Sequence, residues 1–311
     1  MTESNPPIRH HFAPVFYLKR WMGADGLLEQ FSRPGGAERG VRVRRFAPAA
    51  TGYKDFLYTM PGLPAHIEQQ VETKFMQVID DQAAKILKRL EAGEVISWDT
   101  TNRSAWTRFV LSLQLRTPAD IAGIKRRAVD EWDVTVPAIQ DAYESFRKES
   151  DPETFEEFAT SRDPLLLSRV GMRMATRLID HPRIGERINN MTWDVLDLTG
   201  SSLQLLTSDR AVEQVLGLGD PRSFISLPLG PHRVFVATSQ KATLDRLRSH
   251  PPRELVRLRN NSTVKLARDF VWAADRSQQR FIERQFASID APTLGERLAA
   301  VPPVPEPSGS G

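Results

Sequence analysis

The sequence predicts an α+β fold in which an antiparallel sheet is formed by N-terminal and C-terminal strands around a largely helical middle segment. Three observations lead to this class. Segments rich in β-branched, aromatic and aliphatic residues occupy 9–60, apolar residues recur every three or four positions through 65–192, and strand-like segments return between 193 and 287. Sheet elements that are far apart in the sequence are therefore expected to meet in space.

The first 60 residues are expected to form a small antiparallel meander. Its strands are predicted at 11–21 (HFAPVFYLKRW), 26–33 (GLLEQFSR) and 41–48 (VRVRRFAP). The segments GADG and PGGAERG lie between them and contain Gly and Asp, which suit tight turns.

The middle of the chain begins with two amphipathic helices. An apolar stripe over 67–90 predicts one helix that stops by Gly93. The next helix is expected to be capped by Asp99 or Thr101 and to end at Pro118, because proline disrupts a helix interior.

Further helices are expected from 119 to 192, interrupted before the prolines at 152, 164 and 182, because a residue that precedes proline is disfavoured in the helical region. After these, strands are expected at 192–198, 202–209, 224–230, 232–239 and 269–274, and helices at 253–268 and 277–287. We therefore expect one domain over 9–287, with flexible termini at 1–8 and 288–311.

The composition excludes several classes of protein. The chain has no cysteine, which removes disulfides and thiolate metal sites and fits a reducing compartment. No apolar segment approaches the roughly 20 residues of a membrane span, and the N-terminal segment lacks the apolar centre of a signal peptide. We therefore expect a cytoplasmic protein without a membrane partner. The formal net charge of +3 is a weak argument for a polyanionic partner.

Two adjacent histidines open the first strand-like segment. Because neighbouring side chains of a strand point to opposite faces, one of His10 and His11 should face the interior and the other the outside. Imidazole can bind a metal ion or transfer a proton near neutral pH, which makes both residues catalytic candidates. The structural alternative is one core histidine bonded to the backbone and one surface histidine.

Gln114, Arg116 and Asp209 are the other catalytic candidates. Gln114 lies at the edge of the apolar stripe of its helix, where a long amide must find partners. Arg116 can hold a phosphate or carboxylate, or it can bond only the last carbonyl groups of its helix. Asp209 can supply a metal ligand at a strand end, or it can cap, with Thr207 and Ser208, a short helix over the segment RAVEQVLG.

A metal site and a basic segment complete the candidates. The candidate metal ligands are His11, Asp209 and Glu68, whose side chains can bind a divalent metal ion. Such an ion is the expected cofactor if the protein hydrolyses phosphodiesters. In the segment RGVRVRRF, Arg42 and Arg44 should share one face of a strand. Its arginines could contact nucleic-acid phosphates, or they could be solvated charges that keep an edge strand from pairing. The candidate nucleic-acid-binding residues are Arg39, Arg42, Arg44 and Arg45.

Several short motifs follow one another in the order of a known family. The pattern His-His-x-x-Pro-x-Phe-Tyr-Leu covers 10–18, and further motifs continue to about residue 275: YKDFLYT, IEQQVETKFMQVIDDQAAKIL, LSLQLRTP, LTSD, LPLGP and NNSTVKLARDFVWA. On these motifs the chain resembles the bacterial domain-of-unknown-function family DUF4238. Ala211 and Gly230 depart from the proline and serine usual in that family. The resemblance implies a set of matching positions and no particular reaction.

The candidate residues are compatible with two functions of different class. Imidazole, carboxylate and guanidinium groups around one hollow could bind a metal ion, transfer protons and stabilise charge. This arrangement predicts a metal-assisted phosphodiesterase or nuclease that acts on nucleic acid, such as a toxin or a phage-defence effector. The alternative is a non-catalytic binding or interaction protein in which the same residues form a buried polar network.

Overall fold

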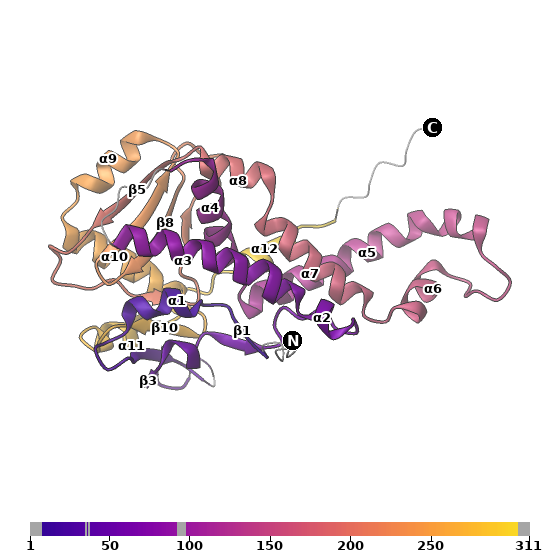
Figure 1. Ribbon diagram of the computed structural model, residues 1–311, viewed down its shortest axis with the longest axis horizontal. Coiled ribbons are helices and arrows are strands. Elements are labelled where there is room, and N and C mark those ends of the chain that lie inside the picture. The colour runs from indigo at the N-terminus through magenta and orange to yellow at the C-terminus, as the bar shows by residue number, and fades with distance from the viewer. Residues whose placement is uncertain (1–7, 35, 37, 92–97, 304–311) are drawn as a thin grey trace, which may run out of the picture.

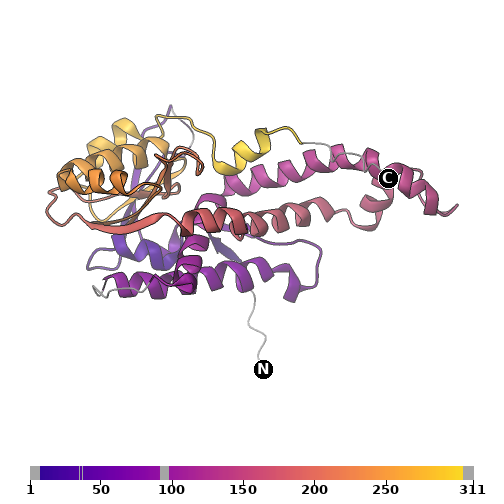
Figure 2. The same cartoon turned by 90° about the horizontal axis from the view of Figure 1, so that it is seen from above.

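A computed structural model describes residues 8–34, 36, 38–91 and 98–303. A body of strands and helices carries a helical arm, formed by α5, α6 and α7, that projects from it in both views (Figures 1 and 2). Within the described residues the strands form three antiparallel sheets. The strands are β1 (Arg9–His11), β2 (Leu28–Ser32), β3 (Arg42–Phe46), β4 (Tyr53–Asp55), β5 (Thr192–Asp197), β6 (Thr207–Ser208), β7 (Glu213–Val215), β8 (Phe224–Gly230), β9 (Arg233–Thr238) and β10 (Phe270–Ala273).

The helical elements dominate the middle of the chain, as predicted. Asp99 caps α4 by accepting a hydrogen bond from the Asn102 amide at 2.8 Å. At the predicted interruptions, α6 begins after Pro152, α7 begins after Pro164 and α8 begins at Pro182. The helices are α1 (Val15–Leu18), α2 (Ala65–Glu68), α3 (Gln77–Glu91), α4 (Thr100–Leu115), α5 (Pro118–Phe146), α6 (Phe155–Arg162), α7 (Leu166–Ile179), α8 (Pro182–Asn189), α9 (Lys241–Ser249), α10 (Pro252–Leu266), α11 (Gln279–Gln285) and α12 (Leu294–Ala300), with 3₁₀ turns η1 (Lys19–Trp21) and η2 (Pro48–Ala50) and a π-helix η3 (Val71–Met76).

One sheet joins the two ends of the chain. Its strand order is β3-β2-β10-β6, and β10 pairs with β2 from Phe270 opposite Ser32 to Ala273 opposite Glu29. Phe31 is buried in the cluster of apolar side chains that this sheet shares with α10 and α11. The predicted α+β class, with a sheet made from both N-terminal and C-terminal strands, is confirmed.

The other large sheet has the order β5-β9-β8-β7 and is covered on both faces. Along β9, Phe235 and Ala237 belong to the main core together with α4, whereas Val234 and Val236 pack with residues of α9 and α10. Alternate residues therefore bury opposite faces, which is the pattern that the period of a strand imposes.

The prediction of a strand over 11–21 is wrong beyond His11. The chain leaves β1 after this residue and forms α1 and η1, and Tyr17, Leu18 and Trp21 are buried. Trp21 follows Leu18 by three residues and Tyr17 by four, the spacings at which side chains are neighbours on a helix. The aromatic composition suggested a strand, but this segment is held as helical turns by distant contacts: the Tyr17 hydroxyl bonds the Thr207 hydroxyl and the Trp21 indole donates to the Leu205 carbonyl, both at 2.8 Å.

The helix predicted over 67–90 is divided. α2 ends at Glu68, η3 follows as a π-helix over six residues, and α3 continues to Glu91. The strand predicted at 202–209 is reduced to β6, and the segment after Asp209 contains the strand β7 in place of the short helix that we expected.

The C-terminal segment is ordered further than predicted. α12 lies outside the expected domain, and it packs against α5 where Gly123 faces Gly295. A Cβ atom on Gly295 would lie 2.3 Å from the carbonyl oxygen of Asp120, so the contact requires glycine. A capping box of Thr293 and Glu296 begins this helix. Its glycine contact is long-range and has no local sequence signal.

Candidate functional site

The junction between α4 and α5 directs two of the candidate residues to different surroundings. α4 ends at Leu115, Arg116 takes a non-helical conformation, and Thr117 caps α5 through the Asp120 amide at 3.2 Å. Within these few residues Arg116 becomes fully buried, whereas Gln114 lines a surface cavity. The five catalytic candidates consequently fall into two groups.

Arg116 belongs to the first group, which we call the Arg116 network: His10, Tyr58, Glu72, Asp80 and Arg116. The Arg116 Nη1 atom donates to Asp80 Oδ1 at 2.9 Å. Its Nε and Nη2 atoms are buried and have no hydrogen-bond partner among the described residues. Because native proteins rarely leave buried donors unpaired, this guanidinium is an unusual feature of the interior.

The two histidines join this network through Tyr58. The His10 Nδ1 atom accepts a hydrogen bond from the Tyr58 amide at 2.9 Å, and the two rings stack with centroids 5.5 Å apart. The Tyr58 hydroxyl donates to the Arg116 carbonyl at 2.8 Å and lies 3.5 Å from the His11 carbonyl. His10 is buried and His11 is half-buried, which confirms the predicted alternation.

His11 is the more accessible histidine. Burial lowers its pKa, the nearby Arg116 and Arg9 lower it further, and a weak contact of Nε2 with the Ala49 carbonyl at 3.4 Å opposes them. The neutral ring is therefore favoured at pH 7. This placement matches the structural alternative for the two histidines. His10 is the core residue bonded to the backbone, and His11 is the more accessible residue.

Glu72 and Asp80 supply carboxylates that the sequence analysis did not select. Glu72 is on η3 and is 8% exposed, and its Oε2 atom is buried without a partner among the described residues. Burial, reinforced by the negative charge of Asp80, raises the pKa of Glu72 to about 7. Glu68, the predicted metal ligand, is half-buried at the end of α2, and its carbonyl accepts from the Met60 amide at 2.9 Å.

The second group lies in a cavity of about 270 Å³ that we call the polar pocket. It is formed by the end of α4, the start of α5, the segment after β6, α10 and the segment that leads into α12. Gln114 and Asp209 both line it. Its charged lining residues are Asp120, Asp209, Arg210, Glu213, Arg259 and Arg297.

Two carboxylates of the polar pocket are held by hydrogen bonds from the protein itself. Asp209 accepts from the amides of Arg268, Asp269 and Phe270 at 3.0, 2.6 and 3.3 Å. Burial raises its pKa to about 6, although these amides act in the opposite direction. The prediction that Asp209 caps a helix is wrong, because its carboxylate accepts hydrogen bonds from the main chain at the start of β10 instead.

Asp120 is held in the same manner. One oxygen accepts from the Gly295 amide at 2.8 Å and the other from the Thr117 hydroxyl. Burial raises the pKa of Asp120, and these hydrogen bonds lower it. The carboxylate thus anchors α12 against the start of α5 and closes one side of the polar pocket.

Two arginines of the polar pocket, Arg210 and Arg259, donate to main-chain carbonyl groups, and Arg259 also donates to the Thr263 hydroxyl at 2.8 Å. Arg210 donates to the carbonyls of Ala291 and Pro292 at 2.6 and 3.1 Å. Arg259 is 7% exposed and donates to the Ala211 carbonyl at 2.5 Å, and its Nε atom is 3.6 Å from Glu213. Sequence reasoning missed both arginines, since neither has a local signal that distinguishes it from a surface charge.

The structure does not assemble the predicted metal site. Among residues 8–34, 36, 38–91 and 98–303, no three His, Asp or Glu side chains lie close enough to hold a metal ion together. His11 lies beside β4 and η2, Asp209 lies in the polar pocket, and Glu68 ends α2. The proposed set of His11, Asp209 and Glu68 is therefore not a single site.

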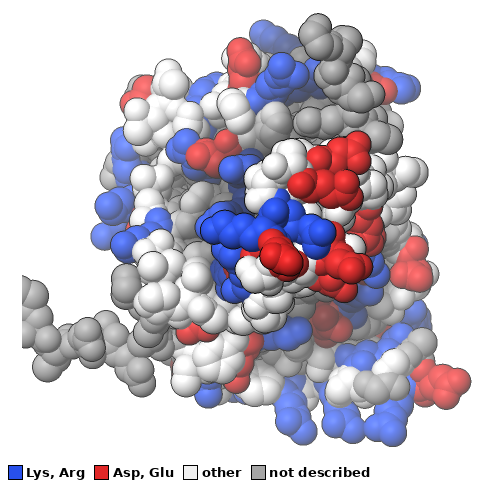
Figure 3. All heavy atoms as spheres, turned by 90° about the vertical axis from the view of Figure 1, so that its right-hand side faces the viewer, with Lys and Arg blue, Asp and Glu red and all other residues white. Residues whose placement is uncertain are grey.

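The basic segment forms the edge strand β3, as the sequence pattern indicated. Arg42 and Arg44 are exposed, and Val43 packs against the core. Arg45 pairs with Asp25 at 2.5 Å and with Glu29 at 3.2 Å, while Arg39 is exposed in the preceding loop. Figure 3 shows Lys and Arg side chains along the lower edge of the molecule, the level at which Figure 1 places β3.

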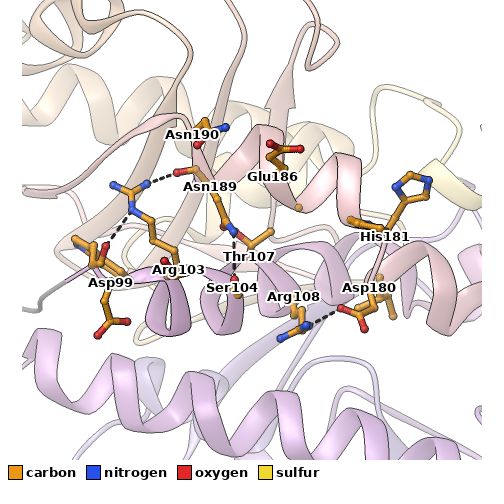
Figure 4. A pocket seen from close by; sticks show the side chains of 15 residues that line it. Asp99, Arg103, Ser104, Thr107, Arg108, Asp180, His181, Glu186, Asn189 and Asn190 are labelled. Atoms are coloured by element: carbon orange, nitrogen blue, oxygen red, sulfur yellow. Dashed lines mark hydrogen bonds and ion pairs between the residues drawn. The ribbon is translucent and has the colours of Figure 1, made fainter.

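A further polar cavity, of about 490 Å³, lies between α4 and α8 (Figure 4). Arg103 points toward α8 and donates to the carbonyls of Asn189 and Met191 at 2.5 and 3.2 Å. The Asn189 side chain points back to Ser104 and Thr107. These bonds fix α8 to α4, so we assign this set a structural role.

Comparison with known proteins gives one match. Over residues 9–277 the chain matches the family described as Protein of unknown function (DUF4238). The chain belongs to this family. Neither the curated proteins nor the solved structures contain a match. The segment of the polar pocket that leads into α12 lies beyond the residues matched to DUF4238. None of the helices in the described part of the chain has the length and apolarity needed to cross a membrane.

Proposed function

We propose that this protein binds a phosphate group of a nucleotide or nucleic acid in the polar pocket. One observation carries the proposal. Asp120 and Asp209 are satisfied by amide and hydroxyl donors, and Glu213 lies beside Arg259, whereas Arg210 is fixed by carbonyl groups and the Arg297 side chain has no partner among the described residues. The balance of unused hydrogen-bonding groups therefore favours an anionic ligand, and guanidinium groups match phosphate geometry.

The size of the cavity defines which part of a ligand fits. A volume of about 270 Å³ is just below the roughly 300–1,000 Å³ typical of small-molecule sites. A phosphate with its sugar fits such a volume better than an entire dinucleotide. Gln114 and Gln214, whose side chains meet at 3.4 Å, supply amide groups for hydroxyls of that sugar.

Hydrolysis of a phosphodiester at the same pocket is the second candidate, and it keeps the function predicted from the sequence. It is favoured by Glu213 at the pocket wall and by Asp209, whose pKa of about 6 suits proton transfer. Mg²⁺ is usually held by one or two carboxylates together with substrate phosphates, so a three-residue protein site is not required. A nuclease of this kind would act as a cytoplasmic toxin or phage-defence effector. The absence of cysteine from the sequence fits a reducing compartment such as the cytoplasm.

Calorimetric titration with AMP and with a short single-stranded RNA tests the binding proposal. Arg297 is exposed and its side chain has no hydrogen bond or ion pair with the described residues, so Arg297→Gln should leave the fold intact. We expect this variant to bind about tenfold more weakly than wild type. Arg253→Gln, an exposed arginine on α10 outside the pocket, is the matched control.

The outcomes separate binding from hydrolysis. Equal affinities of wild type and Arg297→Gln, or no binding of either ligand, would overturn the phosphate-binding proposal. For the second candidate, wild type should cleave RNA in the presence of Mg²⁺ or Mn²⁺, and Glu213→Gln should abolish cleavage. Binding without cleavage under each metal would leave the protein as a binding protein.

A further inference from the structure

A separate hollow of about 690 Å³ lies between α7 and the segment formed by α2 and η3. It is distinct from the polar pocket, with which it shares no lining residue. Its volume is within the range of small-molecule sites, roughly 300–1,000 Å³. Its position where the helical arm joins the body can be followed in Figure 1, where α2 lies beside α7.

The floor of this hollow is apolar. Leu63, Ile67 and Phe75 are partly buried there, and Met60 and Val71 are buried beneath them. These side chains come from the loop before α2, from α2 and from η3, so they approach from one wall. An apolar surface of this kind gains free energy when an apolar group covers it.

The rim carries three cations without carboxylate partners. Lys74 on η3 and Arg173 and Arg177 on α7 are exposed, and none forms an ion pair or side-chain hydrogen bond within the described ranges. The carboxylate at the rim, Asp180, is already paired with Arg108 at 2.6 Å. Since Arg173 and Arg177 are four residues apart, they lie on one face of α7 as a like-charged pair that an anion between them would stabilise.

The π-helical geometry of η3 is a second, independent feature of the wall. Val71, Lys74 and Phe75 all belong to its six residues and all line the hollow. π-Helical turns are rare, and they occur frequently at functional sites. The same segment carries Glu72, whose side chain belongs to the Arg116 network. η3 therefore contributes residues both to the hollow and to the Arg116 network.

We propose that this hollow binds a small amphiphilic anion, an apolar body that carries a carboxylate, sulfonate or phosphate group. The apolar body covers Leu63, Ile67 and Phe75, and the anionic group lies between Lys74, Arg173 and Arg177. Neither feature alone specifies this ligand. A neutral apolar molecule leaves the three cations unpaired, and a small inorganic anion leaves the floor uncovered.

Fluorescence titration with 8-anilinonaphthalene-1-sulfonate, an amphiphilic anion, tests the proposal on the full chain. The informative variant is the double substitution Arg173→Gln/Arg177→Gln, which removes two exposed charges and no described ion pair. Arg183→Gln/Arg187→Gln is the matched control, because these arginines have the same spacing on α8 and are also exposed. Thermal unfolding of each variant shows that the probe is not reporting unfolded protein.

We expect the Arg173→Gln/Arg177→Gln variant to bind the probe about tenfold more weakly than wild type, and the control variant to bind it as wild type does. Decanoate should displace the probe, whereas decanol and inorganic phosphate should not. Equal binding by the two double variants, or displacement by decanol as effective as by decanoate, would overturn the proposal. Binding that falls as protein concentration rises would instead show that a second copy of the chain covers the hollow.

Discussion

The Arg116 network and the polar pocket contain the same kinds of residue but use them differently. In the network, carboxylates and a guanidinium face one another, and Arg116 is bonded to Asp80. In the polar pocket, Asp209 is bonded to main-chain amides and Arg210 to main-chain carbonyls. The two regions meet at the α4–α5 junction, where Gln114 and Thr117 line the polar pocket and Arg116 belongs to the network.

The difference lies in what remains available to a ligand. A charge paired inside the protein mainly affects stability, since removing its partner leaves an uncompensated buried charge. A charge held by the main chain keeps its position when the ligand is absent, which pre-organises it for binding. Substitutions in the network should therefore change stability most, and those at the polar pocket should change binding.

The largest effect is expected from Arg116→Met. It removes the only described partner of the Asp80 carboxylate within a buried cluster, and we expect a loss of about 3 kcal/mol in the free energy of unfolding. Urea unfolding measures the loss. Arg108→Met, which breaks the exposed pair with Asp180, is the control and should cost less than about 1 kcal/mol. Similar losses for both variants would contradict a greater contribution to stability from the buried Arg116–Asp80 pair than from an exposed pair.

The next effect is a pH dependence that comes from Glu72. Its pKa is raised from 4.5 to about 7 in the folded protein, so the folded state binds the proton more tightly than the unfolded state. The stability linked to this proton is complete below about pH 4.5 and is lost as the pH rises to about 7, by about 2–3 kcal/mol. Glu72→Gln should remove this part of the pH dependence.

Unfolding free energies of wild type and Glu72→Gln, measured from pH 4.5 to 8, check this prediction. The difference between the two proteins should widen as the pH rises through about 7 and level off at about pH 8. A constant difference over the whole range would show that Glu72 keeps an ordinary pKa and that the carboxyl is solvated.

An intermediate effect is expected at the contact of α5 and α12. Gly295→Ala would place a Cβ atom against the Asp120 main chain, and we expect a loss of about 1–3 kcal/mol. Because α12 forms a wall of the polar pocket, binding of AMP should weaken in the same variant. Gly185→Ala on α8, where a Cβ atom meets nothing within 4 Å, is the control and should not be destabilising.

The smallest effect on stability is expected at the edge strand β3. Arg42→Gln/Arg44→Gln replaces exposed charges and should change the unfolding free energy by less than about 0.5 kcal/mol. If these arginines bind nucleic acid, the salt dependence of RNA affinity should fall by about one for each arginine removed. An unchanged salt dependence would leave them as charges that protect a sheet edge.

The candidate site could be predicted in part. The alternation of His10 and His11 follows from the strand period, and Gln114 lies at a cavity as expected of a long amide at the edge of an apolar stripe. Asp80 and Arg259 were not selected. Their partners lie 36 and 48 residues away along the chain, in Arg116 and Ala211, and no local pattern reports such a pair.

The sequence by itself determined the α+β class, the helical middle and the positions where prolines interrupt it, because backbone period and proline geometry act over a few residues. It also indicated a charged strand over 41–48, whose position at a sheet edge is given by the strand order of the structure. The tertiary structure decided that residues 15–21 are helical, that the chain after Asp209 forms β7, and that α12 completes the polar pocket. Those outcomes depend on contacts between distant segments, such as the hydrogen bond from the Trp21 indole to the Leu205 carbonyl. Contacts of this kind outweigh the preference of a short segment for helix or strand.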